Sequence, residues 1–301
     1  MKKYEFNQQT QYFCIDPAHL AEGLAAAQGK YNAICVKPLN LRLKNLALDL
    51  PLLASNTGLA RLDIHVDIPI PAGEFKLLER MVHLEELKFK ECGPFDFSKL
   101  SKLRRLTLMS GTALDGLDKV LTFEELYLGL WNSDTLPKAI GGISATSVRI
   151  SASKKLGGIQ PLCDLSGLEK LMLQDLPALQ VGKEINKLKA LTDLHVEKCG
   201  WTDFSEIQIG ALRRLFASKL ESLHFIGQLK HLDDLFFWDC VDGNLAPVLE
   251  HPALTRIRFV PAKKHYTHKL ADLQKARAVF SKRGMSLGGP DLGDARSVDR
   301  L

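Results

Sequence analysis

Two stretches of the chain decide its fold: residues 84–93 read LEELKFKECG, and residues 191–200 read LTDLHVEKCG. Both follow the pattern apolar-x-x-apolar-x-apolar, and both carry a cysteine five residues after the central leucine. The likeness extends further along the chain, where residues 96–98 and 203–205 both read DFS. Two segments so far apart that match at this spacing indicate an internal repeat.

The same apolar pattern recurs along most of the chain. From Leu62, the central residue of its first copy, to Ile257, that of its last, the average step is about 22 residues, within the range of about 20 to 29 expected for short solenoid repeats. The copies begin at Leu59, Leu84, Leu103, Phe123, Ala145, Leu168, Leu191, Leu212, Leu232 and Leu254. The sequence therefore predicts about ten stacked coils.

Each copy predicts a short strand whose alternate residues point inward, followed by an apolar return that closes the coil. In the return, Phe97, Leu100 and Leu103, like Phe204 and Ile207, have roughly helical spacing. One coil cannot bury its own core, so neighbouring coils must cover each other. We expect one continuous buried stack that contains Leu87, Leu106, Leu126, Leu171, Leu194 and Leu235.

These features resemble the leucine-rich repeat family, whose pattern L-x-x-L-x-L-x-x-(N/C)-x-L places Asn or Cys where Cys92, Cys199 and Cys240 stand. The resemblance covers roughly residues 40–262. It implies an α/β solenoid with a curved parallel sheet on the concave side and short helices or turns on the convex side. Other coils depart from the Asn/Cys position, which makes a continuous side-chain ladder there doubtful; they hold Gly111, Trp131, Ser153, Leu176 and Leu220.

The ends of the array need caps. We expect an N-terminal capping segment at 1–40, with a helix at about 16–28, opened by Asp16 and Pro17, and a strand at about 31–36. The repeats then occupy 41–262, beginning with an irregular coil around Leu43, Leu46 and Leu48. A capping helix is expected at 263–284, and the remainder, 285–301, reads as a flexible tail.

Composition narrows the functional classes. The chain of 301 residues is 46% hydrophobic and 25% charged, as is typical of globular proteins. The N-terminus does not read as a secretory signal, and no apolar run is long enough to span a membrane, so we expect a cytoplasmic protein without a membrane partner. The net charge of +5 is dispersed, and acidic residues interrupt any basic stripe, which disfavours nucleic acid. The acidic residues are Asp63, Glu85, Glu86, Glu124, Glu125, Asp233 and Asp234.

We find no motif for catalysis, and expect no enzyme activity, no cofactor and no metal site. Phosphate-loop, nucleophile-elbow and zinc-protease motifs are lacking, and no C-x-x-C occurs. Cys92, Cys199 and Cys240 are interpreted as small buried structural thiols. The pair His265 and His268 lacks an evident third metal ligand, and reads as a polar junction or a basic anion-binding spot. An unrecognised enzymatic or effector site would have to use Cys240 or His265.

The residue between the two inward positions of each strand points to the concave face, as does the residue two further on. Aromatic residues collect there toward the C-terminal half. Aromatic, Met and Arg side chains are enriched where interfaces concentrate their energy, although these rings could instead pack on one another or on the C-terminal cap. The predicted partner-binding residues are Tyr127, Arg149, Met172, His195, Glu197, Phe216, Phe236, Trp238 and Arg258.

Taken with the family resemblance, these residues predict a non-catalytic module that binds another protein on its concave face, in an adaptor, inhibitor or immunity-type role. The sequence indicates a binding surface but does not identify the protein that binds there.

Overall fold

The computed structural model describes residues 2–39, 48–71, 73–90, 95–109, 116–120, 122–260, 263–269, 273 and 286–288. The chain divides into two compact units, Met1–Ser153 (unit 1) and Lys154–Leu301 (unit 2). Both are built from the same repeating coil. In each coil a short strand is followed by a return segment.

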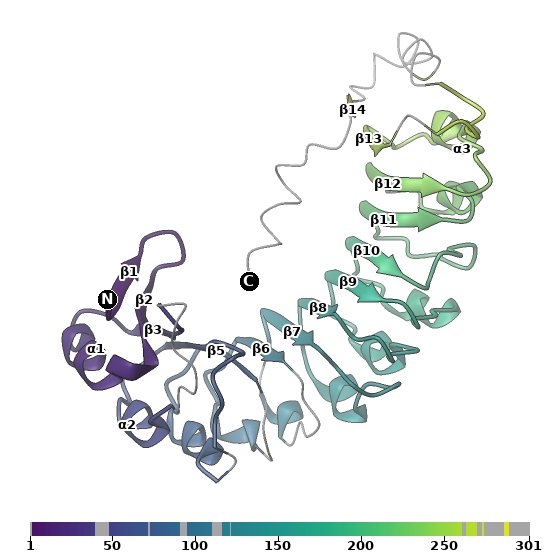
Figure 1. Ribbon diagram of the computed structural model, residues 1–301. Coiled ribbons are helices and arrows are strands. Elements are labelled where there is room, and N and C mark those ends of the chain that lie inside the picture. Colours follow the sequence, from purple (N-terminus) through teal and green to yellow (C-terminus); the bar gives the residue numbers. More distant parts are fainter. Residues whose placement is uncertain are drawn as a thin grey trace. The chain divides into compact units, whose positions relative to one another are not determined.

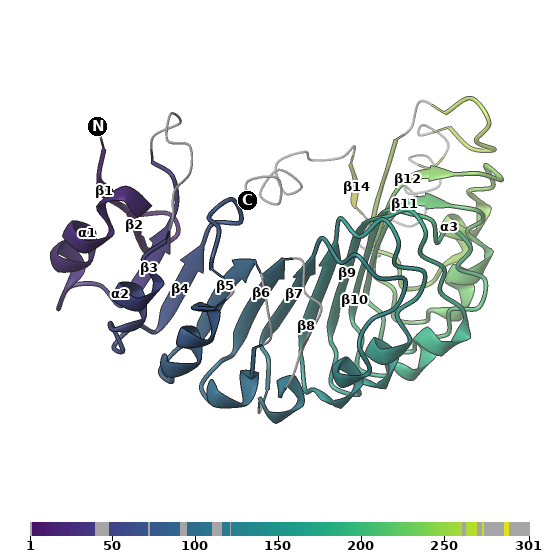
Figure 2. The same ribbon diagram turned by 60° about the horizontal axis from the view of Figure 1, so that its bottom comes forward.

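Unit 1 is a sheet that opens with an antiparallel hairpin and continues as parallel strands in chain order. Figure 2 shows β4 to β8 side by side and pointing the same way. The strands are β1 (Tyr4–Asn7), β2 (Tyr12–Ile15), β3 (Ala33–Val36), β4 (Arg61–Ile64), β5 (Glu86–Lys90), β6 (Arg105–Met109), β7 (Glu125–Gly129) and β8 (Ser147–Ser151).

The helical segments of unit 1 are short, and most are 3-10 turns. The α-helices are α1 (Leu20–Ala27) and α2 (Leu50–Ala54). The 3-10 helices are η1 (Pro17–His19), η2 (Phe75–Arg80), η3 (Phe97–Lys99), η4 (Leu117–Lys119) and η5 (Lys138–Gly142).

Unit 2 repeats the plan with parallel strands in chain order (Figure 1). Its strands are β9 (Lys170–Leu176), β10 (Asp193–Cys199), β11 (Arg214–Leu220), β12 (Asp234–Cys240), β13 (Arg256–Phe259) and β14 (Ser286–Gly288). Its helical segments are η6 (Gln160–Asp164), η7 (Lys183–Lys187), η8 (His224–Gln228) and α3 (Ala246–Glu250).

The repeated leucines form the core of each unit. The ten predicted copies correspond to the ten strands β4 to β13 among the described residues. In unit 1 the central residues pair in register from Leu62 to Val148, and in unit 2 from Leu171 to Ile257. All six leucines expected in the core are at most 2% exposed, which confirms their burial. They are Leu87, Leu106, Leu126, Leu171, Leu194 and Leu235.

The strands end in a bend that the pattern did not predict. Residues Leu130, Ala152, Asp175 and Lys198 each stand four positions after a central residue and have φ between 51° and 55°. This left-handed conformation costs a non-glycine residue about 1 to 2 kcal/mol. The bend turns the following residue toward the interior, so the burial gained there offsets the strain. That following position is the Asn/Cys position of the family, where Trp131, Ser153 and Leu176 are buried.

The return segments are tighter than the helical spacing suggested. Phe97 begins the three-residue 3-10 helix η3, whereas Phe204 and Ile207 belong to a turn closed by a hydrogen bond from Ile207 N to Phe204 O. A return of so few residues is too short to continue as an α-helix, whereas a 3-10 turn is closed by a hydrogen bond between residues three positions apart. The apolar side chains of these returns still point inward, since Phe97, Phe204 and Ile207 are all buried.

The N-terminal segment consists of the hairpin of β1 and β2, the helices η1 and α1, and the strand β3. Asp16 caps η1 by accepting a hydrogen bond from Ala18 N, with Pro17 in the first turn, and α1 follows directly. The hairpin of β1 and β2 precedes it. At the other end, most of the expected helix at 263–284 lies outside the described residues, as do Leu43 and Leu46. Three residues of the expected tail, Ser286–Gly288, form β14 beside β13.

A buried histidine closes the return after α3. His251 Nε2 lies 3.1 Å from Leu229 O, and Nδ1 lies within 3.3 Å of the amide nitrogens of Ala253 and Leu254. Two amide donors at Nδ1 require a lone pair there, so Nε2 carries the proton and the ring is neutral. Burial accordingly lowers the pKa of His251 below its ordinary value.

This arrangement predicts a stability that depends on pH. Because the folded-state pKa is lowered, the contribution of His251 is complete above the unfolded pKa of about 6.5 and is lost as pH falls through the folded value. Chemical denaturation between pH 7.5 and 5 should show a falling free energy of unfolding, with a smaller fall in His251→Asn. Equal pH slopes in the two proteins would contradict the assignment.

Among the residues that the structure describes, no helix combines the length and hydropathy needed to cross a bilayer.

Candidate binding surface

The residues on either side of each inward leucine point to the opposite face of the sheet, because side chains alternate along a strand. We call this the open face of each unit. Each parallel strand aligns its outward residues with those of the next, so they form columns. Three columns result: one just before the central residue, one just after it, and one two residues further on.

In unit 2 the middle column is aromatic. The strand register pairs His195 with Phe216, Phe216 with Phe236, and Phe236 with Arg258. The ring centroids of His195 and Phe216 are 4.2 Å apart, and those of Phe216 and Phe236 are 4.8 Å apart. These separations follow from the spacing of about 4.8 Å between strands.

Trp238 and Arg258 complete this group. Trp238, two residues after Phe236, meets Phe216 edge-on with centroids 5.6 Å apart. The Arg258 guanidinium lies over the Phe236 ring, 5.0 Å from its centroid. We call His195, Phe216, Phe236, Trp238 and Arg258 the aromatic cluster. All five residues are half-buried, so they keep accessible surface while their contacts restrict their conformational freedom.

Acidic residues border the aromatic cluster on two sides. Glu197 Oε2 lies 3.2 Å from His195 Nε2 and accepts a hydrogen bond of 3.3 Å from Gln174 Nε2. On the other side, Asp234 Oδ2 lies 3.4 Å from the Arg258 guanidinium. These contacts fix the orientation of the His195 and Arg258 side chains.

The remaining predicted residues have different positions. Met172 pairs with His195 in register and extends the middle column to β9, half-buried. Tyr127 and Arg149 belong to unit 1, where the Arg149 guanidinium lies 4.7 Å from the Tyr127 ring centroid. Tyr127 is only 9% exposed, and its hydroxyl is 2.6 Å from Ser151 Oγ. Expected on the surface, Tyr127 is instead covered by its neighbours and offers little area to a partner.

The sequence reading missed the first column, whose residues alternate in charge. In unit 2 it runs Lys170, Asp193, Arg214, Asp234 and Arg256, with ion pairs between Arg214 and Asp193 and between Arg256 and Asp234. The sequence contains a signal for this column, because the charge of the residue before each central residue changes sign from one coil to the next. Opposite charges on neighbouring strands favour this register over a shifted one.

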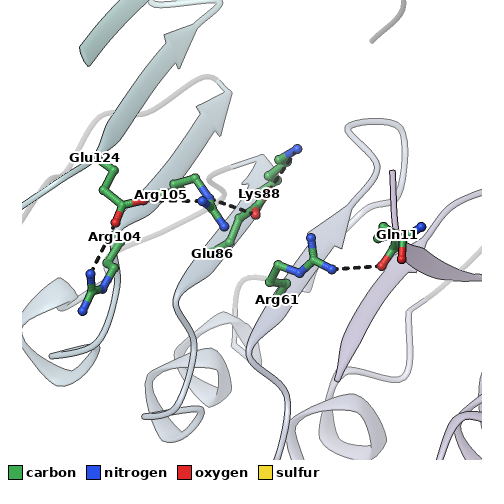
Figure 3. Close-up of polar contacts among 7 residues, drawn as sticks. All are labelled: Gln11, Arg61, Glu86, Lys88, Arg104, Arg105 and Glu124. Carbon is green, nitrogen blue, oxygen red and sulfur yellow. Dashed lines mark hydrogen bonds and ion pairs between the residues drawn. The ribbon is translucent and has the colours of Figure 1, made fainter. Parts of the chain in front are cut away.

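In unit 1 the first column also alternates in charge, as Arg61, Glu86, Arg105 and Glu125, and Figure 3 shows ion pairs that join it to neighbouring positions. Glu86 lies between Lys88, at 3.2 Å, and Arg105, at 3.1 Å, and Arg105 also reaches Glu124 at 3.4 Å. Arg61, earlier in the same column, donates to the backbone carbonyl of Gln11 at 3.0 Å. This bond ties the loop of the N-terminal hairpin to the first coil of the array.

Cys240 and His265, the residues reserved for an enzymatic alternative, are close together without forming a nucleophile and its base. Cys240 is fully buried, and burial, together with the neighbouring Asp242, raises the pKa of its thiol to about 12. The thiol donates to Asp242 Oδ1 at 3.1 Å, whereas His265 Nε2 lies 2.9 Å from the backbone carbonyl of Cys240. A nucleophilic cysteine needs an accessible thiolate, which this geometry does not provide.

Of the other two cysteines that were interpreted as structural thiols, the structure describes Cys199. Cys199 is half-buried rather than fully buried, and its thiol donates to the carbonyls of Glu197 and Leu173 at 3.3 and 3.4 Å. Cys92 lies outside the described residues. No group of three or more His, Cys, Asp or Glu side chains suited to a metal ion occurs in the described part of the chain.

Comparison with solved structures identifies similar folds. An internalin from Listeria monocytogenes aligns over 92% of this chain and 85% of its own, with a TM-score of 0.57 and 14% sequence identity. A leucine-rich repeat protein from Leptospira interrogans aligns over 92% and 88%, with a TM-score of 0.42 and 15% identity. No family model matches the sequence. No curated protein matches it either. At 14% identity, the likeness to the internalin establishes the fold alone.

Proposed function

We propose that this chain, which has the leucine-rich repeat fold, binds another protein through the aromatic cluster on the open face of unit 2, in an adaptor, inhibitor or immunity-type role. The fold is typically a protein-binding module and is usually non-catalytic. One observation carries the proposal: Phe216 contacts His195, Phe236 and Trp238 on a sheet face, and all four rings are partly exposed.

The energetics of interfaces support this surface. Binding free energy concentrates in Trp, Tyr and Arg side chains that are held in place before the partner arrives. The aromatic cluster holds Phe216 between His195, Phe236 and Trp238, so ordering these rings on binding costs little entropy. The bordering Glu197 carboxylate, which is partly exposed, supplies part of a polar rim of the kind that surrounds such anchors.

Removing the indole should weaken binding strongly. We expect Trp238→Ala to cost about 2 kcal/mol of binding free energy, which is about 30-fold in Kd. The protein should be captured with its partner from the native source, and the Kd then measured by calorimetry with purified components. Neighbouring genes that encode a toxin would favour the immunity role among the three.

Lys99→Ala serves as the control, since Lys99 is exposed in the return of unit 1, where it pairs with Asp96 at 3.8 Å. It should bind like the wild type, and both variants should keep a folded circular dichroism spectrum. A Trp238→Ala protein that unfolds would place the indole in the core. One that binds with unchanged Kd would rule out the aromatic cluster as the binding surface.

A further inference from the structure

Two cysteines of the N-terminal segment are direct neighbours on adjacent strands. Cys14 in β2 and Cys35 in β3 are register partners in a parallel pair. Neighbouring strands are about 4.8 Å apart, and disulfides join Cα atoms about 4.4 to 6.8 Å apart. The spacing of the two residues along the chain does not predict this pairing, because the pairing depends on the register of β2 against β3.

The two side chains share one environment. Both belong to a small cluster with Tyr12 and Ala33, against which Leu39 packs. Cys14 is 1% exposed and Cys35 8% exposed, and both are free thiols. The Cys14 thiol lies 3.9 Å from the backbone carbonyl of Tyr12, and Cys35 is its direct neighbour on the adjacent strand.

Electrostatics assign the two sulfurs different roles. The neighbouring Cys35 thiol lowers the pKa of Cys14 against the effect of burial, and the nearby Lys37 ammonium lowers it further. The neighbouring Cys14 sulfur and burial raise the pKa of Cys35. Cys163 provides a contrast, because burial without a neighbouring thiol raises its pKa to about 12. Cys14 is therefore suited to attack as a thiolate, with Cys35 held as a thiol beside it.

We propose that Cys14 and Cys35 form a redox-active dithiol that low-molecular-weight disulfides of the glutathione type oxidise to a cross-strand disulfide. The Cys14 thiolate attacks one sulfur of the small disulfide, whose S–S bond breaks and releases one small thiolate. The Cys35 sulfur then attacks Cys14, and the second small thiol leaves with the Cys35 proton. The dithiol loses two electrons, and the small disulfide is reduced to two thiols.

The position of the pair at the edge of the array provides access and reversibility. Local opening of the hairpin of β1 and β2 makes the buried Cys14 reachable. In-register parallel strands also hold Cβ atoms farther apart than the separation of about 3.8 Å that a relaxed disulfide prefers. The cross-link is therefore strained, which makes it reducible under mild conditions.

Peptide mapping of the full-length chain tests the proposal. The native protein is equilibrated in mixtures of reduced and oxidised glutathione, free thiols are blocked by alkylation, and the protein is digested with trypsin. Cys14 falls in peptide 4–30 and Cys35 in peptide 31–42, because the bond between Lys37 and Pro38 resists trypsin. We expect the two peptides to be linked in oxidised mixtures and separate in reduced ones, while peptide 156–170, with Cys163, remains alkylated throughout.

Two variants test the order of the steps. Cys35→Ser should retain glutathione on Cys14, because no second thiol displaces it. Cys14→Ser should react with glutathione at least 10-fold more slowly at Cys35. The proposal is overturned if the linked peptide forms only after denaturant is added, or if native wild-type protein keeps both thiols in the most oxidised mixture. Equal reaction rates of the two variants would overturn the assignment of Cys14 as the attacking residue.

Discussion

A Leu194→Ala protein is expected to lose about 2 to 5 kcal/mol of unfolding free energy. Leu194 is 2% exposed in β10 and lies in register between Leu171 and Leu215. Truncation removes the burial of the side chain and leaves a cavity between three stacked coils, which a close-packed repeat cannot collapse to fill. Urea denaturation followed by circular dichroism measures the change as a lower midpoint.

The chain offers a matched control for this substitution. Leu130 is 43% exposed at the end of β7, so Leu130→Ala removes the same atoms without making a cavity. Its φ of 55° is equally unfavourable for leucine and alanine, and the backbone term cancels. We expect a change of at most about 0.5 kcal/mol. Similar losses in the two variants would show that Leu194 does not belong to a close-packed core.

Gly243→Ala is expected to destabilise the C-terminal end of unit 2 by about 3 kcal/mol or more. Gly243 has φ +66°, and a Cβ atom there would overlap the backbone carbonyl of His265. The segment around His265 is held by hydrogen bonds from Thr267 N to Gly243 O, at 2.8 Å, and from Leu245 N to Thr267 Oγ1, at 3.1 Å. The overlap is between the added Cβ and the backbone oxygen of His265, so rotation of a side chain cannot relieve it.

Hydrogen exchange locates this effect. In Gly243→Ala the amides of Thr267 and Leu245 should exchange faster, and thermal unfolding should begin earlier. Gly210→Ala is the control, since a Cβ at Gly210 would meet no atom within 4 Å. It should leave stability unchanged or raise it slightly, by about 0.4 to 1 kcal/mol, through a less flexible unfolded chain. Unchanged exchange at Thr267 in Gly243→Ala would show that the contact with His265 is not maintained in solution.

The aromatic cluster shows how much of the candidate surface the repeat pattern could predict. Register assigns a face to each residue, so the outward positions of Phe216, Phe236 and Trp238 follow from the inward positions of Leu215, Leu235 and Phe237. The same rule placed Tyr127 outward, but Arg149 and Ser151 then cover it. Whether an outward ring is exposed depends on the neighbouring side chains, which a single coil does not specify.

The sequence by itself determined the ten strands, the inward leucines and the composition of the open face, because each depends on a local alternation repeated every 22 residues or so. Only the tertiary structure decided which side chains meet. It closed most of the returns as 3-10 turns, bent Lys198 and its equivalents into left-handed geometry, and paired Cys14 with Cys35. Local periodicity fixes the face on which a side chain lies. Contacts between strands depend on long-range register and on competition for the same space, which no short stretch of sequence contains.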